Sequence, residues 1–387
     1  MNELRRKIEA EILERGPIPF SRYMEMCLYD PQLGYYSRNA AQFGKAGDFY
    51  TSSDVHAVFG RLLARQFEEM WRILGSPERI VIRELGPGRG LFAQDVLDWS
   101  EKKFPDFFRV LQYELVEQSA ALRARLEETL KRHIESGKAV SETSGAETRY
   151  SRRQVGATEV APIQRVHAIV FANEFFDAMP VEIVSDEGSL RIDTRNGRFV
   201  ETWVPSSAEE LEFLDRYSIH PEPGERVEVS RQSLMQMNKD ATIERGFVVV
   251  IDYGYTREEQ LAGRHRGTVK AIRQHSLSAN PYEAPGEQDI TADVNFTALA
   301  AVAQGRGLCA QKLLTQSQFL MGIGEANQFA DAFEECRLPQ ERAKVALQLK
   351  HLVTPAGMGE SFHVLVASKG VDAEKVSRLS GLGFGRR

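Results

Sequence analysis

The sequence contains few cysteines, and they are spaced neither as metal ligands nor as a disulfide framework. Three occur in 387 residues, Cys27, Cys309 and Cys336, and no CxxC pair is present. Disulfide-dependent secreted domains carry an even, closely spaced set, and zinc sites repeat short Cys or His spacings. We therefore expect reduced thiols and no metal site.

Long apolar runs and an excess of positive charge are also missing. No apolar stretch approaches the ~20 residues of a transmembrane helix. The net charge is −6, which disfavours a nucleic-acid partner because such binding needs clustered Lys and Arg. The N-terminal segment is rich in glutamate, unlike a mitochondrial transit peptide, and lacks the apolar core of a secretory signal. We therefore expect a cytoplasmic protein without a membrane span.

The remaining composition is that of an ordinary globular protein. Hydrophobic residues make up 42% and charged residues 27% of the chain, which suffices for a buried core. The length allows one large domain with insertions or two domains.

One stretch, from Val81 to Leu97, carries the clearest functional signal. An apolar run ends in Glu84-Leu85, glycines follow at positions 86, 88 and 90, and an amphipathic segment begins. This order predicts a strand, a glycine turn and a helix that approach a nucleotide-like ligand. A dinucleotide fingerprint would need a small residue at Leu91, so a dehydrogenase is disfavoured. GxGxG after an acid is instead typical of S-adenosylmethionine methyltransferases.

Further buried strands are predicted to end in polar side chains. The run from Val110 to Val116 is followed by Glu117, which is placed to hold the two hydroxyls of a ribose. Val166–Phe171 leads to Asn173-Glu174, and Phe247–Tyr255 contains Asp252. Because ligands bind at the carboxyl ends of strands in an open α/β sheet, we expect Glu84, Gly86, Glu117, Asn173 and Glu174 to meet in one crevice.

The rest of the chain alternates helical and extended patterns. Helices are expected over 2–15, 20–28, about 54–74, 207–217, 230–238, 289–303, 316–329 and 339–352. Asn196-Gly197 predicts a hairpin turn within an antiparallel β excursion over 181–204. The polar stretch 132–165 is expected to form a long loop or a poorly ordered excursion.

Several phrases give the chain a family resemblance. They are, in order, LYDPQLGYY, FGKAGDFYTS, ELGPGRG, LVEQS, FANEFFDAMPVE, IDYG, PGEQDITADVNF, TQSQFLMGIG and GMGESFHVLVASKG. Together they span about residues 20–370, and the chain closely resembles the MidA-like S-adenosylmethionine-dependent methyltransferases. A eukaryotic member of that family is the mitochondrial complex I assembly factor that methylates an arginine of a complex I subunit.

The resemblance implies an α/β fold with a class I (Rossmann-like) methyltransferase sheet. The expected parts are an N-terminal helical region with a cofactor-lining loop (1–75), the core (76–180 and 245–387) with a helical insertion near 286–355, and a β/helical insertion (181–244). The implied cofactor is S-adenosylmethionine.

The resemblance also implies roles for individual residues. Cofactor contacts are expected from the glycine turn and from side chains around it, namely Gly86, Pro87, Gly88, Gly90, Glu117, Thr51, Ser52 and Asn173. The acceptor side is assigned to Glu174, Asp177 and Asp252 as catalytic residues, because carboxylates bind a planar guanidinium well. Asp177 is alternatively only a cap of the next element.

The leading functional hypothesis is methylation of a protein arginine, with a complex I subunit-like acceptor. Two alternatives stay open: a methyltransferase for a small molecule or another residue, and a non-catalytic assembly protein that keeps the cofactor site. The oligomeric state is not predicted.

Overall fold

The computed structural model describes residues 2–38, 57–142, 167–273, 276–278 and 280–385, which fall into two compact units. The hairpin unit comprises Met1–Tyr50, Glu174–Lys239 and Asp252–Val302. The sheet unit comprises Thr51–Asn173, Asp240–Ile251 and Ala303–Arg387. The chain passes between the units directly after β5 (His167–Asn173) and within β10 (Arg245–Tyr255).

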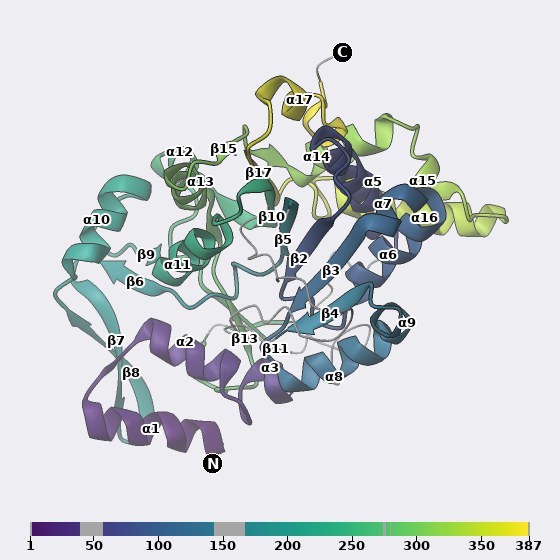
Figure 1. Ribbon diagram of the computed structural model, residues 1–387. Coiled ribbons are helices and arrows are strands. Elements are labelled where there is room, and N and C mark those ends of the chain that lie inside the picture. The colour runs from purple at the N-terminus through teal and green to yellow at the C-terminus, as the bar shows by residue number, and fades with distance from the viewer. Residues whose placement is uncertain (1, 39–56, 143–166, 274–275, 279, 386–387) are drawn as a thin grey trace, which may run out of the picture. The chain divides into compact units, whose positions relative to one another are not determined.

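The sheet unit is built on a mostly parallel sheet (Figure 1). Its strand order is β15-β17-β10-β5-β2-β3-β4, with β16 also paired to β17. Adjacent strands from β10 to β4 are parallel. The remaining bounds are β2 (Ile80–Leu85), β3 (Leu111–Val116), β4 (Ala139–Glu142), β15 (Cys309–Ala310), β16 (Leu314–Thr315) and β17 (Phe362–Lys369). The predicted α/β, Rossmann-like fold class is confirmed.

Aromatic side chains pack two helices against the central strand β5 of this sheet. Phe67 on α5 (Val58–Ile73) and Phe92 on α6 (Leu91–Lys103) both contact Phe171 on β5. The Phe92 and Phe171 rings stack with their centroids 4.6 Å apart. Since β2 and β5 are largely buried, their apolar runs match the pattern of parallel strands covered on both faces.

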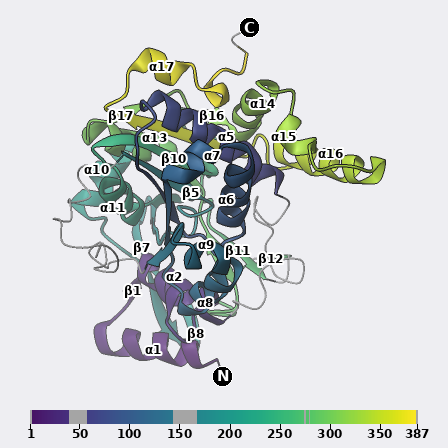
Figure 2. The same cartoon turned by 45° about the vertical axis from the view of Figure 1, so that its right-hand side comes forward.

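The other helices of the sheet unit are mostly short. They are α7 (Pro105–Val110), α8 (Ala120–Thr129), α9 (Lys131–Glu135), α14 (Gln316–Glu325), α15 (Ala330–Phe333), α16 (Pro339–Val353), α17 (Ala373–Ser377) and the 3₁₀ turn η2 (Ser380–Leu382). Within this unit α16 extends away from the sheet in both views (Figure 2). Among the helices in the described ranges, none is long and apolar enough to cross a bilayer.

The hairpin unit has its own antiparallel sheet and core. Its sheet has the order β1-β7-β6-β9, with β8 paired to β7. The turn between β7 and β8 is formed by Asn196-Gly197, as predicted. The bounds are β1 (Ile18–Pro19), β6 (Glu182–Ser185), β7 (Gly188–Arg195), β8 (Arg198–Val204) and β9 (Val227–Val229).

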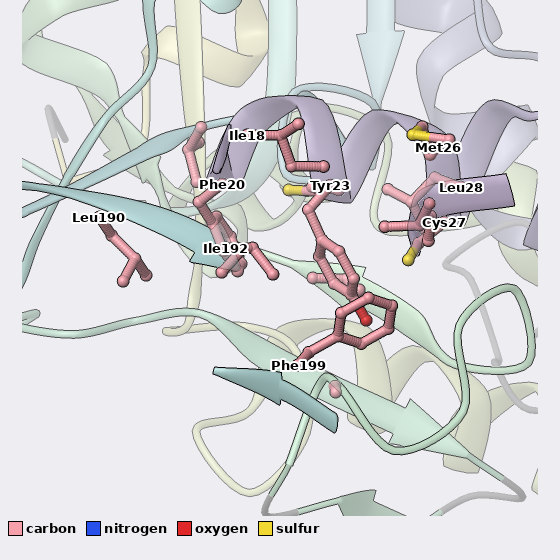
Figure 3. Packing of buried hydrophobic residues seen from close by; sticks show 14 of the residues in the cluster. Ile18, Phe20, Tyr23, Met26, Cys27, Leu28, Leu190, Ile192 and Phe199 are labelled. Atoms are coloured by element: carbon pink, nitrogen blue, oxygen red, sulfur yellow. The ribbon is translucent and has the colours of Figure 1, made fainter. Parts of the chain in front are cut away.

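Helix α2 (Phe20–Tyr29) supplies much of the core of the hairpin unit. Tyr23, Cys27 and Leu28 pack with Ile192 and Phe199 of the hairpin (Figure 3). Tyr23 meets Phe199 edge to face, with the ring centroids 5.5 Å apart. Helix α1 (Glu3–Arg15) adds three buried residues, Leu4, Ile8 and Ile12.

The hairpin unit has a second apolar cluster and, beyond the elements named above, further helices and strands, three of which form a small sheet of order β12-β11-β13. They are α3 (Tyr35–Arg38), α10 (Ala208–Tyr217), α11 (Arg231–Asp240), α12 (Arg257–Leu261), β11 (Lys270–Arg273), β12 (Ser276–Ser278), β13 (Asp289–Thr291), β14 (Val294–Asn295) and α13 (Phe296–Gly305). The cluster joins Val184 of β6, Phe213 and Leu214 of α10, and Ala298 of α13.

Two expectations about secondary structure were wrong. Residues 289–291 and 294–295 form strands, and the helix expected from position 289 begins at Phe296. The Asn295 side chain accepts the N–H of Ala298 at 2.9 Å. The polar stretch after residue 131 is not all loop, since it contains α9 and β4. Strand β4 pairs with β3 at the sheet edge, where a half-polar composition hides the strand pattern. Residues 143–166 lie outside the described part.

Candidate functional site

The three glycines after β2 form a turn that other residues would strain. Gly86, Gly88 and Gly90 have φ of 62°, 54° and 77°, in the left-handed region. A Cβ atom on Gly90 would lie 3.1 Å from the Leu130 side chain, whereas one on Gly88 would meet no atom of the described residues within 4 Å. The Gly86 N–H donates to the Val116 carbonyl at 3.0 Å, which ties the turn to β3. The turn therefore leaves open space beside Gly88 for a ligand.

Glu117, directly after β3, is joined to this glycine turn. Its carboxylate accepts the backbone N–H of Ser119 at 2.8 Å and is also hydrogen-bonded by the N–H groups of Gly88 and Gln118. Burial nevertheless raises the pKa of Glu117 to about 7. Arg123 donates to the Glu117 carbonyl oxygen at 2.7 Å and so holds the backbone of the turn.

A second buried acid lies beside Glu117. Glu84 is 4% exposed and accepts the Tyr113 hydroxyl at 2.8 Å. Burial raises the pKa of Glu84 to about 8, and Glu117 adds to that rise. The sequence drew attention to Glu84 as the acid before the glycines but not to Tyr113, whose only signal is a hydroxyl within a buried strand.

In the hairpin unit, a sharp acidic turn begins at Glu174, the residue that follows β5. Glu174 has a φ of 49°, which is strained for a residue with a side chain. Oδ2 of Asp252 accepts the N–H groups of Phe175, Phe176 and Asp177 at 3.1, 2.9 and 3.3 Å. Oδ1 of the same carboxylate accepts the N–H of Tyr253 at 3.0 Å. Asp252 thus holds the turn by its backbone.

Asp177 lies at the end of this turn and is only partly satisfied. It is 4% exposed, and its Oδ1 has no hydrogen-bond partner among the residues that the structure describes. The Tyr253 hydroxyl hydrogen-bonds to the Asp177 carboxyl, yet burial raises the pKa of Asp177 to about 6. Burial and the neighbouring Asp177 and Glu174 raise the pKa of Asp252 as well. None of the ion pairs in the described ranges involves Asp177 or Asp252.

Two tyrosines from the N-terminal segment form further hydrogen bonds within the hairpin unit. The Tyr36 hydroxyl donates to Asp289 Oδ1 at 3.1 Å, and the Tyr29 hydroxyl donates to the Ala178 carbonyl at 2.9 Å. The backbone N–H of Ala292 donates to the Asp177 carbonyl at 2.9 Å. Segments far apart in the sequence therefore meet around Asp177 within one unit.

Within the sheet unit, the residues expected at the carboxyl ends of the strands lie near one another. Strands β2, β3 and β5 are adjacent, so Glu84, Gly86, Glu117 and Asn173 lie along one edge, and Asn173 pairs with Ile251 of β10. Glu174 belongs to the hairpin unit. Thr51 and Ser52 lie outside the described residues. Within the described ranges, no three His, Cys, Asp or Glu side chains are grouped to hold a metal.

The sheet unit has the features that a nucleoside ligand requires. The open space at Gly88 admits a close approach to the backbone, and the Glu117 carboxylate can accept hydrogen bonds from two hydroxyl groups. The partly satisfied Asp177 in the hairpin unit can accept a hydrogen bond from a positively charged donor.

A solved structure with a related sequence supports this interpretation of the sheet unit. A protein from Burkholderia thailandensis, crystallised with S-adenosyl-homocysteine, matches with a TM-score of 0.80 and 28% identity over 97% of this chain and 94% of that chain. A native crystal structure of a COG1565 superfamily protein from Burkholderia thailandensis matches with a TM-score of 0.78 and 27% identity, over 99% of this chain and 94% of that chain.

Curated relatives match over most of their length. The mitochondrial NDUFAF7 homolog of Drosophila melanogaster, a protein arginine methyltransferase, is 30% identical over 98% of this chain and 88% of its own. The human protein arginine methyltransferase NDUFAF7, mitochondrial, is 27% identical over 92% of this chain and 81% of its own.

The expected cytoplasmic location was wrong. The relatives from fly, zebrafish and human are all named mitochondrial. The prediction rested on an acidic N-terminal segment, and the composition of one segment does not decide the compartment of a protein.

The family model described as putative S-adenosyl-L-methionine-dependent methyltransferase matches residues 62–313. This range contains the glycine turn, Glu117, the acidic turn and Asp252. The cofactor is S-adenosylmethionine, as predicted, and the chain belongs to this family of S-adenosylmethionine-dependent methyltransferases.

Proposed function

We propose that the protein methylates an arginine side chain of a protein acceptor. The observation that carries the proposal is the acidic turn after β5, where one carboxylate oxygen of the buried Asp177 has no partner in the described part of the chain. An open oxygen on a buried carboxylate is costly unless a ligand satisfies it. Relatives named protein arginine methyltransferases support a guanidinium as that ligand.

Each part of the chain has a separate proposed role. The glycine turn with Pro87 and Glu117 holds the cofactor, and Asn173, Thr51 and Ser52 are proposed as further contacts. The bound cofactor supplies an activated methyl group. Glu174 and Asp177 orient the acceptor guanidinium by charge-assisted hydrogen bonds. Asp252 is proposed to act as a positioning residue, because both of its carboxylate oxygens accept backbone N–H groups.

The acceptor is proposed to be a subunit of respiratory complex I. The family resemblance and the mitochondrial names of the relatives support a search that begins with such subunits. The alternatives are a small-molecule or non-arginine acceptor, and a scaffold that binds the cofactor without transferring the methyl group.

Cofactor binding can be tested with a matched pair of glycine variants. Gly88 and Gly224 both have positive φ, and a Cβ on either would meet nothing within 4 Å. Both alanine variants therefore carry similar backbone strain, but only Gly88→Ala fills the space beside the glycine turn. We expect calorimetry to show at least about tenfold weaker S-adenosylmethionine binding for Gly88→Ala, equal to about 1.4 kcal/mol. Gly224→Ala should bind normally.

The identity of the methyl acceptor is tested with S-adenosylmethionine that carries a labelled methyl group. Wild-type protein is incubated with complex I subunits and with peptides that carry arginine or lysine, and the modified residue is found by mass spectrometry. We expect label on arginine, and we expect Glu174→Gln to bind the cofactor but to lose transfer. Label on lysine or on small molecules alone would refute the arginine assignment. Binding without any transfer would favour the scaffold.

A further inference from the structure

The strongest unexplained feature is the pair of buried acids at the cofactor edge of the sheet unit. Tyr113 pairs with Ile82 across β2 and β3, two residues before Glu84, so the two side chains share one face of the sheet. The Tyr113 hydroxyl donates to Glu84 Oε2 at 2.8 Å, and Tyr113 itself is fully buried. The tyrosine thereby fixes the position of the Glu84 carboxyl group.

Among the described residues, few positively charged groups act on the two carboxyl groups at this edge. Glu84 forms no ion pair with a described basic side chain, and the groups that act on it are Tyr113 and Glu117. Glu117 is stabilised by backbone N–H groups and by Arg123. Two carboxyl groups that repel each other in a buried place gain most from a ligand that brings a positive charge.

We infer that Glu84, held by Tyr113 beside Glu117, makes the cofactor site select the positively charged donor over the neutral product. S-adenosylmethionine carries a sulfonium charge, and S-adenosyl-homocysteine is the corresponding neutral thioether. The inference requires the cofactor of the proposed function but not its arginine acceptor. It assigns to these residues a role in discriminating two ligands that share the same adenosine and amino-acid ends.

The selection follows from the ionisation of the two carboxyl groups. Burial raises the pKa of Glu84 to about 8 and that of Glu117 to about 7, so both titrate near neutral pH. A cation in the site favours the ionised forms, and its binding expels protons. When the methyl group leaves, the positive charge on sulfur disappears, and the carboxyl groups take up protons from solvent. The preference for donor over product should therefore rise with pH.

The experiment measures two affinities across pH by calorimetry. S-adenosylmethionine and S-adenosyl-homocysteine are titrated into the whole protein between pH 6 and pH 8.5. We expect the ratio of their affinities to rise about tenfold in favour of the donor, the change that corresponds to one pKa unit. Titrations in two buffers of different ionisation enthalpy should show that the donor releases more protons than the product.

Three variants test which carboxyl groups cause the pH dependence of the affinity ratio. Glu84→Gln should make the rise of the affinity ratio with pH smaller, because only Glu117 then titrates in this range. Tyr113→Phe should displace the rise to higher pH, because the tyrosine hydrogen bond lowers the pKa of Glu84. Glu228→Gln is the matched control, since Glu228 is also buried with a pKa raised to about 7 but belongs to the hairpin unit. Its ratio should follow that of the wild type. Thermal melting verifies that each variant is folded.

The outcomes separate this inference from the proposed function. Binding of both ligands with an affinity ratio that does not change with pH would overturn the inference and leave the methyltransferase intact. A displaced rise in Tyr113→Phe would support it even if Glu84→Gln fails to fold. An equal change in Glu228→Gln would assign the pH dependence to general unfolding and overturn it. A wild-type protein that binds neither ligand would refute the cofactor role itself.

Discussion

At position 174 the chain keeps a glutamate where the backbone favours glycine. A left-handed conformation costs a residue with a Cβ atom about 1–2 kcal/mol. Strain of this kind persists where surrounding structure enforces it and is often found at functional sites. Asp252 supplies that enforcement here, through hydrogen bonds to the three residues after Glu174.

Replacing Glu174 by glycine should therefore separate stability from activity. We expect Glu174→Gly to leave the free energy of unfolding unchanged or to raise it by up to about 1 kcal/mol, while methyl transfer falls at least about tenfold. Asn196 has a φ of 51° in the hairpin turn, so Asn196→Gly relieves similar strain away from the acidic turn and should keep full activity. Urea unfolding and the labelled-donor assay provide the two measurements. Full activity of Glu174→Gly would exclude a role for its carboxylate.

Among the elements, α15 is attached to α5 by ion pairs of two kinds. Asp331 of α15 pairs with Arg65 of α5 and is almost fully buried. Glu335, just beyond α15, pairs with Arg61 and Lys102 and is about half exposed. Buried pairs cost much when one partner is removed, whereas exposed pairs contribute little.

Removing the acid of each pair should therefore lower the free energy of unfolding by different amounts. We expect Asp331→Ala to lower the free energy of unfolding by about 3 kcal/mol, at the lower end for a buried pair because Arg65 can still reach solvent. Glu335→Ala should cost less than about 1 kcal/mol. Urea unfolding of both variants measures the two losses in free energy of unfolding. Equal losses would mean that burial does not distinguish the pairs.

The sequence predicted most elements whose apolar pattern is long or clearly bounded. Strand β2 ends at Leu85, where the predicted apolar run ends, and α16 extends only one residue further than expected. Strand β4 was missed because its short edge pairing leaves little apolar pattern, and the helix expected from 289 was displaced by pairing of β13 with β11. Helical periodicity cannot reveal such long-range pairing.

The candidate site was predictable only in part. Glycines at fixed spacing and an acid after a strand are local signals, so the glycine turn and Glu117 could be named. The hydrogen bonds of Asp252 to residues about 75 positions away, and of Tyr113 to Glu84, depend on tertiary structure. The catalytic assignments and the domain bounds stay predictions.

Across the whole molecule, buried acids should make stability depend on pH. Five carboxyl groups have a pKa raised by burial to between about 6 and about 8, namely Glu84, Asp95, Glu117, Asp177 and Glu228. The unfolded values are about 4, so the folded state binds more protons between pH 4 and pH 8. Stability therefore falls as pH rises through that window. The lowered pKa of His167 acts in the opposite direction, but it is one group.

We accordingly expect a lower free energy of unfolding at pH 8 than at pH 6. Each extra proton that the folded state binds relative to the unfolded state contributes a slope of about 1.4 kcal/mol per pH unit. Urea unfolding over this range measures the slope, and Glu228→Gln should make it shallower. Stability that rises from pH 6 to pH 8 would contradict the burial of these groups.

The packing around α2 has a practical consequence. Cys27 is enclosed in the core of the hairpin unit, and burial raises the pKa of its thiol to about 12, so alkylating reagents cannot reach a thiolate there. Cys309 is exposed and Cys336 partly so, and both belong to the sheet unit. The chain therefore carries its own chemical reporters: labelling at Cys27 marks opening of the hairpin unit alone, without any engineered probe.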